Sequence, residues 1–134
     1  AGMKYLLDTC TVSDFVKGHA AVLARVKATP PHLIAISTIT RMEIEFGLQL
    51  NPERARKLAP VIEAFLASIQ ILPFGEADAV AAAAARANLQ KRGQAIGAYD
   101  VLIAGTGMAH GLTLVTRNTK DFAPAGAELL NPWE

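Results

Sequence analysis

Short apolar runs alternate with longer segments of helical periodicity along the chain. The apolar runs, typical of buried strands, cover residues 5–7, 33–37, 70–74, 112–116 and, as a last short strand, 127–130. The helical segments cover residues 11–18, 20–28, 38 or 40 to 50, 53–69, 76–92 and 98–110. This alternation predicts an α/β fold with a mostly parallel central sheet of about four to five strands, flanked by helices.

Three segments add detail to this pattern. Pro60 lies inside the helical segment 53–69 and removes a backbone donor, so a kink or a break is expected there. Residues 117–122 are polar and are expected to form a loop. Residues 98–110 are apolar almost all round, which predicts a buried helix.

Composition and charge narrow the class of protein. With 134 residues, of which 51% are hydrophobic and 19% charged, residues 1–134 are expected to form a single domain. The net charge of +1 gives no strong overall field towards nucleic acid or membrane, although a local basic patch remains compatible with it. The single cysteine, Cys10, excludes an internal disulfide and a cysteine-built zinc site, which suits a reducing cytoplasm.

The ends of the sequence and its apolar runs predict a cytoplasmic protein without a membrane anchor. We expect no signal peptide, and no apolar run is long enough to span a bilayer. Residues 1–2 precede Met3 and are interpreted as the remnant of a tag.

The first predicted strand ends on a single acid. In KYLLDTC, Asp8 follows the strand, and Thr9, Thr11 and Ser13 come directly after it. One interpretation is that Asp8 caps the next helix, for which aspartate is a favoured residue. The other is that Asp8 binds a ligand, since ligands bind at the carboxyl edge of an open parallel sheet.

Glu43 also has two interpretations. Thr40 and Glu43 have the spacing of a capping box, which is a common pattern at helix starts. Gly47 lies one turn beyond Glu43 on the same helix face, and its small size suggests that something packs closely there. Glu45 is expected on another face, towards solvent.

Asp100 is the acid with the most unusual surroundings. Its neighbours in IGAYDVLIAG are apolar, and position 104 holds alanine instead of a basic partner. An unpaired carboxylate in a buried helix is costly, although a position in the first helical turn lowers that cost. A metal or a substrate is the more natural partner, and Ala104 and Gly107 are expected to leave space for it.

Asn118 and Asp121 follow the last long strand, where an Asx turn would explain either residue alone. If the strands are neighbours in one parallel sheet, these residues and the acids named above meet at one edge. Clusters of carboxylate and amide oxygens suit hard cations such as Mg²⁺ and Mn²⁺.

At these residues the chain resembles the PIN-domain ribonucleases, and in particular the VapC-type toxins of bacterial type II toxin–antitoxin pairs. LLDTC resembles the family's opening motif, with Cys10 where asparagine is usual. The segments ISTITRMEIEFG, QAIGAYDVLIA and LTLVTRNTKDF resemble three further motifs in order, and LLNPWE resembles family endings. The resemblance covers nearly the whole chain and implies a PIN-like fold of three layers.

The resemblance implies a role for each acid. Asp8, Glu43 and Asp100 match the metal-binding acids of the family. Many relatives have aspartate at the position of Asn118, and others place an acid at the position of Asp121. The neutral side chain of Asn118 leaves open which of the two serves as the fourth catalytic residue, and whether one or two metal ions bind.

The implied activity is Mg²⁺- or Mn²⁺-dependent hydrolysis of RNA by an endoribonuclease. Family members commonly cut structured RNA such as transfer RNA, form homodimers, and are blocked by a cognate VapB-like antitoxin that often inserts a basic side chain. Contact with DNA is implied only through the antitoxin. Thr9, Thr116 and Arg117 are candidates to contact the substrate phosphate, with a surface salt bridge as the alternative for Arg117. A bacterial cytoplasmic location follows from the same resemblance.

Two rival functions are compared with this one. A receiver-type phosphoacceptor module requires adjacent acids after the first strand and a lysine after a late strand, whereas Asp8 stands alone and Arg117 follows residues 112–116. A PIN fold that acts with its antitoxin in a DNA-bound regulatory complex stays open because Asn118 carries no charge. Trp133 is interpreted as a packing anchor, and Arg54, Arg56 and Lys57 as a solvated basic face.

Overall fold

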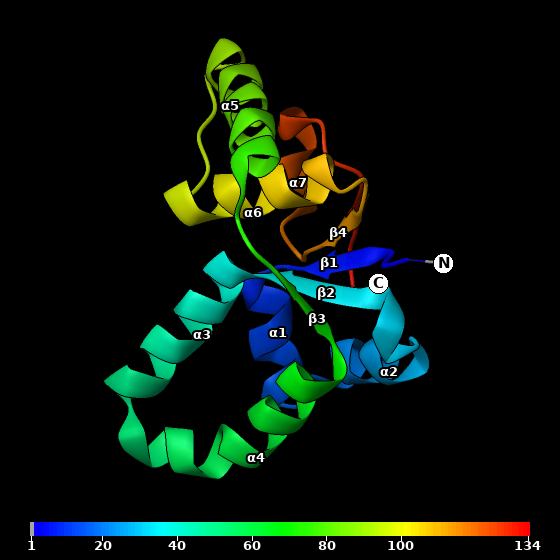
Figure 1. Cartoon of the computed structure of the whole chain (residues 1–134), viewed down its shortest axis with the longest axis vertical. Coiled ribbons are helices and arrows are strands. Elements are labelled where there is room, and N and C mark those ends of the chain that lie inside the picture. The colour runs from blue at the N-terminus through cyan, green and yellow to red at the C-terminus, as the bar shows by residue number, and fades with distance from the viewer. Residues whose placement is uncertain (1) are drawn as a thin grey trace.

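The structure is a computed structural model that describes residues 2–134 (Figure 1). Ala1, part of the segment interpreted as a tag remnant, lies outside the described residues. The strands are β1 (Tyr5–Leu7), β2 (Ile34–Ser37), β3 (Gln70–Leu72), β4 (Thr113–Val115) and β5 (Leu129–Leu130). The α-helices are α1 (Thr9–Val16), α2 (Ala20–Ala28), α3 (Thr38–Leu50), α4 (Pro52–Ser68), α5 (Glu76–Lys91), α6 (Ala98–Ala109) and α7 (Thr119–Phe122). Two 3₁₀ turns, Pro31–Leu33 and Ala123–Ala125, complete the chain.

The five strands form one parallel sheet in the order β3-β2-β1-β4-β5. The strand β1 lies in the centre, with Leu6 opposite Ala35 of β2 and Leu114 of β4. The predicted α/β fold with a mostly parallel sheet is confirmed. Because all strands run in one direction, their carboxyl ends lie along one edge, and this edge collects the residues that follow β1, β2 and β4.

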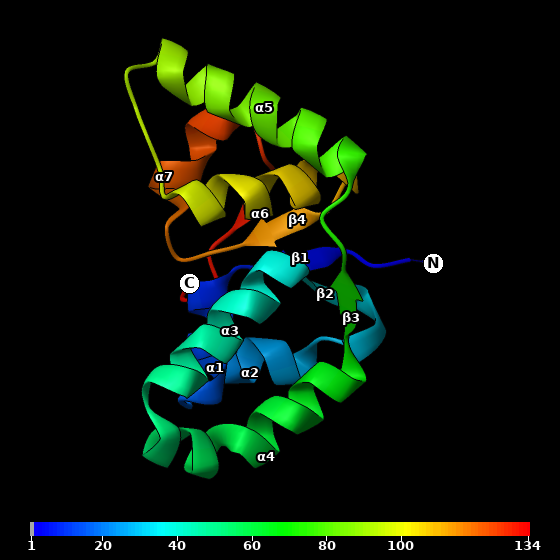
Figure 2. The ribbon, with the colours of Figure 1, turned by 60° about the vertical axis from the view of Figure 1, so that its left-hand side comes forward.

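Successive residues of each strand face opposite layers, which gives the sheet two hydrophobic cores. Leu6 and Leu114 pack with Ile103 on the side of α6, whereas Leu7 and Val115 belong to a second core on the opposite face. Figure 2 shows α6 lying on the sheet with α5 outside it, and α1, α2 and α4 on the other face. The three layers expected from the family resemblance are therefore present.

The helix α6 is buried as its composition predicted, and it packs very closely against α5. A Cβ atom at Gly105 would come within 2.7 Å of the Ala82 Cβ and of the Asp78 carbonyl oxygen, so only glycine allows this approach. The carboxylate of Asp78 is buried between the same helices and accepts a hydrogen bond from the Thr106 hydroxyl at 2.6 Å. This hydrogen bond compensates part of the cost of burying the Asp78 carboxylate.

Several expectations from the sequence were wrong in detail. Residues 117–122 are not entirely a loop, because Thr119–Phe122 forms the short helix α7, whose Phe122 is buried in the core on the α6 side. The helix α4 continues through Pro60, so of the two expected outcomes, a kink or a break, the break does not occur. Strand β3 ends at Leu72 instead of residue 74, and α1 begins at Thr9, two residues earlier than predicted.

Two expectations about small residues were also wrong. A Cβ atom at Gly47 would meet no atom within 4 Å, so nothing packs closely against it. Ala104 is completely buried, and a Cβ atom at Gly107 would lie 3.5 Å from the Leu6 side chain. This face of α6 therefore packs against the sheet and leaves no space for a ligand. No helix within residues 2–134 combines the length and apolar character that crossing a bilayer requires.

Candidate active site

Asp8 lies at the carboxyl end of the central strand, and one of its two predicted roles, the cap of the following helix, is confirmed. Its side chain is only 2% exposed, and its Oδ1 accepts a hydrogen bond from the Thr11 backbone N–H at 2.9 Å, which caps α1. The Thr11 hydroxyl donates to the Val115 carbonyl oxygen at 2.9 Å and ties α1 to β4. The cap uses Oδ1, so Asp8 is held rigidly at the edge of the sheet where the other acids gather.

Glu43 is held by a side chain from α1 and not by a capping box. Helix α3 is capped by Ser37, whose hydroxyl accepts from the Ile39 N–H at 3.0 Å. The Thr9 hydroxyl instead donates to Glu43 Oε1 at 2.7 Å and lies 3.2 Å from Thr40 Oγ1. The helix following β1 thus orients the acid supplied by the helix following β2. Thr9 was predicted to contact the substrate phosphate. In the structure its hydroxyl donates its hydrogen bond to Glu43.

Asp100 shows that the acids share one electrostatic environment. Partial burial, as the largest cause, and the negative charges of Asp8, Glu43 and Asp121 together raise its pKa from 3.8 to about 6. Its carboxylate turns back over the start of α6, since a Cβ atom at Gly97 would lie 3.2 Å from Oδ2. The helix dipole at this end favours a negative charge, yet desolvation and repulsion prevail.

The residues after β4 differ in what they contribute. Thr116 is completely buried, and its hydroxyl accepts from the Asn118 N–H at 3.1 Å, so it shapes the turn into α7 and does not face solvent. Asn118 precedes α7 without a capping hydrogen bond from its side chain. Asp121 is exposed, and its charge is felt by Asp100. Asp121 therefore supplies the fourth negative charge at this edge.

The pKa of Cys10 is shifted by charged groups near the acids. Its pKa is raised by burial first, and then by the negative charge of Asp8, while the positive charge of Arg117 opposes the increase. Asp100 and Asp14 act in the same direction as Asp8. Arg117 therefore brings a positive charge to the acidic edge, as expected for a residue that follows β4.

The donor set at this edge consists of carboxylate oxygens, which suits a hard divalent cation. Within residues 2–134, no three acidic, histidine or cysteine side chains already meet at the spacing of a metal cage. Besides burial, which is the largest cause, the charges of the neighbouring acids also raise the pKa of Asp100. A cation would relieve that repulsion, and in this respect the donor set fits Mg²⁺ or Mn²⁺.

A groove of about 260 Å³ opens beside the acids, between α1, α3 and α4. Thr9, Glu43 and Gly47 line the groove, and Lys17 and Arg54 contribute positive charge to it. Arg54 thus lines the groove, whereas the sequence placed it on a basic face that is usually solvated but could contact RNA phosphates. The sequence pattern did not indicate this groove, because its walls come from three helices that are separated along the chain.

Comparison with known proteins shows to which family this arrangement of sheet and acids belongs. A model of the PIN domain family matches residues 5–127. The tRNA(fMet)-specific endonuclease VapC of Shigella flexneri is 31% identical over 131 residues, which cover 98% of each chain. FitAcB from Neisseria gonorrhoeae has a crystal structure that matches with a TM-score of 0.87 and 31% identity, over 97% of this chain and 99% of that one.

A second solved structure contains nucleic acid. VapBC2 from Rickettsia felis, bound to a DNA fragment from its promoter, matches with a TM-score of 0.86 and 26% identity, over 96% of this chain and 98% of that one. The motifs, the parallel sheet and the acidic edge agree with these matches. The chain therefore belongs to the PIN domain family, and its relatives there are VapC-type ribonucleases of toxin–antitoxin systems.

Proposed function

We propose that the chain is an endoribonuclease that hydrolyses RNA, with transfer RNA as its substrate class, and depends on Mg²⁺ or Mn²⁺ held by Asp8, Glu43 and Asp100. Asp121 adds the fourth charge, and Asn118 adds a neutral oxygen beside it. The observation that carries the proposal is the gathering of carboxylates at one edge of the sheet, where burial first, and then the charges of Asp8, Glu43 and Asp121, raise the pKa of Asp100 to about 6. Such repulsion between like charges costs stability, and a cation site explains why the fold retains it. The name of the Shigella relative supports transfer RNA.

The side chains of this chain perform distinct tasks in the proposed reaction. Asp8 is fixed by its capping bond, and Glu43 is fixed by the Thr9 hydroxyl, so both acids are oriented before any ligand arrives. A bound divalent cation would supply an activated water and stabilise the charge that develops on the scissile phosphate. Arg117 supplies the positive charge that draws the phosphate backbone towards this acidic edge.

The proposal is tested by removing one charge without removing the helix cap. Asp8→Asn keeps a favoured capping residue of the same shape, so the fold should persist. We expect cleavage of bulk transfer RNA in Mn²⁺ or Mg²⁺ to fall by about a hundredfold or more, because one of the carboxylates proposed to hold the charge-stabilising cation is lost. Circular dichroism would check the fold, and excess chelator should abolish cleavage by the unmodified chain.

Glu45→Gln is the matched control. Glu45 lies on α3 two residues from Glu43, but it is exposed and pairs with Arg41 at 3.2 Å. Exposed ion pairs contribute little energy, so cleavage by Glu45→Gln should stay within about twofold of that by the unmodified chain. Cleavage that survives chelation, or an Asp8→Asn variant as active as the Glu45→Gln variant, would overturn the metal-dependent mechanism. A folded chain that binds no divalent cation and cuts no RNA would overturn the enzymatic function.

The structural relatives also support a partner. The Rickettsia structure is a VapBC pair on promoter DNA, so we propose that a VapB-like antitoxin binds this chain in the bacterial cytoplasm and carries it to DNA, with the chain itself as a homodimer. The second candidate function is regulatory binding of this kind without nuclease activity, and the neutral Asn118 favours it. Co-expression with the antitoxin and a shift assay on the operator would test the complex. Asp8→Asn should retain this DNA-bound complex while it loses cleavage.

A further inference from the structure

The end of the sheet brings a late segment of the chain next to Arg117. Val115 lies opposite Leu130 in the parallel pair of β4 and β5, and the Thr116 N–H donates to the Leu130 carbonyl oxygen at 3.0 Å. The residues that follow the two strands, Arg117 on one side and residues 131–134 on the other, therefore leave the sheet side by side. This edge is the one at which the catalytic acids gather.

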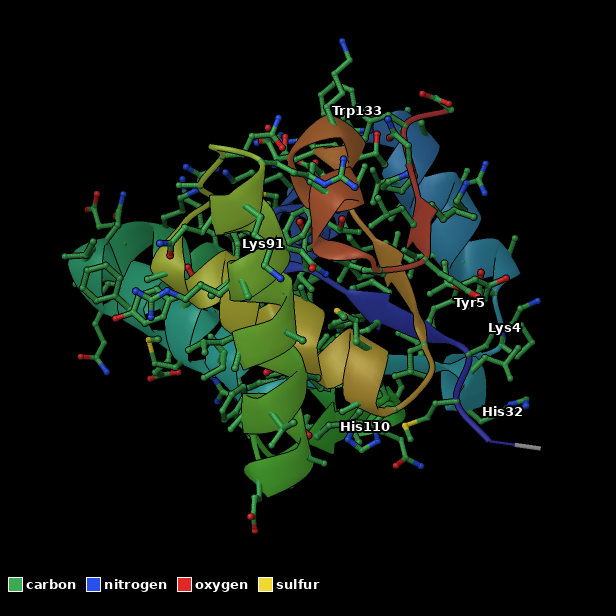
Figure 3. All side chains as sticks on the ribbon, turned by 90° about the horizontal axis from the view of Figure 1, so that it is seen from above. Lys4, Tyr5, His32, Lys91, His110 and Trp133 are labelled. Atoms are coloured by element: carbon green, nitrogen blue, oxygen red, sulfur yellow. The ribbon has the colours of Figure 1, made fainter. Side chains whose placement is uncertain are left out.

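A local turn then directs Trp133 towards the start of the chain. Asn131 Oδ1 accepts from the Trp133 N–H at 2.9 Å, which is the hydrogen bond of an Asx turn. The indole ring stacks on the His19 ring, with 4.2 Å between the ring centroids. In Figure 3, Trp133 lies on the side of the molecule opposite His110, beside the last segment of the chain. Trp133 thus packs against His19 while its side chain stays partly exposed.

Asp14 joins Trp133 and Arg117 in one network. Its Oδ2 accepts from Trp133 Nε1 at 3.0 Å, and its Oδ1 accepts from Arg117 Nη1 at 3.3 Å. The Arg117 guanidinium also lies over the Trp133 ring, 5.5 Å from the centroid. Exposed ion pairs usually contribute little, but the Asp14 side chain is only 14% exposed, and the indole contact fixes a planar guanidinium from a second direction.

The network leaves part of the guanidinium available. Among the described residues, each hydrogen bond of the Arg117 side chain leaves from Nη1, so the donors on Nη2 and Nε are free for a ligand. Arg117 follows the carboxyl end of β4 by two residues, and Asp14 lies on α1, the helix that Asp8 caps at the same edge of the sheet. The free donors are thus available at the rim of the acidic edge.

We propose that Asp14 and Trp133 are positioning residues that hold the Arg117 guanidinium at the rim of the catalytic edge, where it binds a phosphate of the RNA. The inference rests on the proposed nuclease function and adds two residues to it. An acidic edge repels a polyanion, so a fixed cation at its rim is needed to bring the backbone close. Arginine presents a planar pair of donors that matches a phosphate, provided that its orientation is fixed.

A double-mutant cycle tests this coupling with bulk transfer RNA as the substrate. Arg117→Ala should raise KM about tenfold or more while kcat changes less, because it removes a charge-assisted hydrogen bond made with bound substrate. Trp133→Phe keeps an aromatic ring but removes the Nε1 donor, and Asp14→Asn weakens the acceptor. Each should raise KM about three- to tenfold. In the Arg117→Ala background, the same two changes should have little further effect.

Arg41→Ala is the control, since Arg41 is exposed to nearly the same extent as Arg117 (38% and 40%) and forms an ion pair within its own helix. Its KM should change less than twofold. If Trp133→Phe raises KM by the same factor with and without Arg117, the residues act independently and the inference is wrong. An effect confined to kcat would also contradict it.

A binding measurement separates this inference from the nuclease function. The affinity for bulk transfer RNA in chelator, measured against salt, gives the number of phosphate contacts. Arg117→Ala and Trp133→Phe should each flatten the slope of log affinity against log salt by up to about 0.9, the contribution of one contact. This result would support the inference even if no RNA is cut. Slopes equal to that of the unmodified chain would overturn it, whether or not the chain is a nuclease.

Discussion

Replacement of Asp100 by asparagine should stabilise the chain in the absence of metal. The pKa of Asp100 is higher in the folded chain, at about 6, than the ordinary value of 3.8 that applies when the chain is unfolded. Between these values the folded chain binds more protons than the unfolded chain, so the free energy of unfolding falls as pH rises. The contribution of protonated Asp100 is complete below 3.8 and is lost as pH passes through about 6.

The magnitude follows from the same pair of values. A rise in pKa from 3.8 to about 6 corresponds to about 3 kcal/mol of destabilisation at neutral pH. Because the Asp100 carboxylate is half exposed, solvent screening reduces this cost to roughly 1–2 kcal/mol. Asparagine has nearly the same shape and no charge. We therefore expect Asp100→Asn to raise the free energy of unfolding at pH 7.5 by roughly 1–2 kcal/mol and Tm by roughly 3–8 °C.

Urea unfolding in chelator at pH 5 and pH 7.5 measures this effect. The two proteins should differ less at pH 5, where Asp100 of the unmodified chain is largely protonated. Glu45→Gln, on the exposed face of α3, should differ from the unmodified chain by less than about 0.5 kcal/mol at both pH values. An Asp100→Asn variant that is less stable at pH 7.5, or whose advantage is the same at pH 5, would show that the acids do not repel one another as described.

A divalent cation should reverse the advantage. In the proposed mechanism Mn²⁺ binds only the folded chain and neutralises the acids, so it should raise the Tm of the unmodified chain through a stabilisation of RT ln(1 + [L]/Kd). The Asp100→Asn variant should respond less, since one carboxylate is gone. Differential scanning fluorimetry over a range of Mn²⁺ concentrations gives both curves, and equal responses would exclude Asp100 from the cation site.

Three further changes test the packing that supports the site. Gly105→Ala should destabilise the chain by about 1–3 kcal/mol or more in urea unfolding, because its Cβ would lie 2.7 Å from Ala82. Gly47→Ala, where a Cβ meets nothing within 4 Å, should stabilise α3 by up to about 1 kcal/mol in the same assay, and a loss of stability would contradict the open space. Thr106→Val removes the donor at 2.6 Å from the buried Asp78 carboxylate and should cost about 1–3 kcal/mol, measured by thermal unfolding at pH 7.

The local pattern of the sequence determined most of the secondary structure. The strands are visible in the sequence as apolar runs because both faces of a parallel sheet are buried. Helix ends are marked by residues such as Gly93 and Gly111, which adopt a positive φ. The short helix α7 escaped prediction because its four residues are too few for a periodic pattern, and the burial of Phe122 stabilises it instead. Pro60 likewise stays within α4, where Ile62 and Phe65 are buried.

The acids could be chosen from the sequence, but their partners could not. Asp8 ends an apolar strand, and Asp100 interrupts an apolar helix, so each departs from a pattern that is visible along the chain. Their convergence, however, was inferred from the family resemblance and a presumed order of strands. The structure supplies the reason, because β1 lies between β2 and β4 and all strands end at the same edge.

Only the tertiary structure decided which side chains hold the acids and Arg117 in place. Thr9 and Glu43 are 34 residues apart, and Asp14 and Trp133 are 119 residues apart, so no local period connects them. Such contacts depend on which strands pair and on how α1 packs against α3 and the end of β5. The sequence by itself therefore determined the class of fold and indicated the acids, while the sheet order decided which hydroxyl, carboxylate and indole groups contact Glu43 and Arg117.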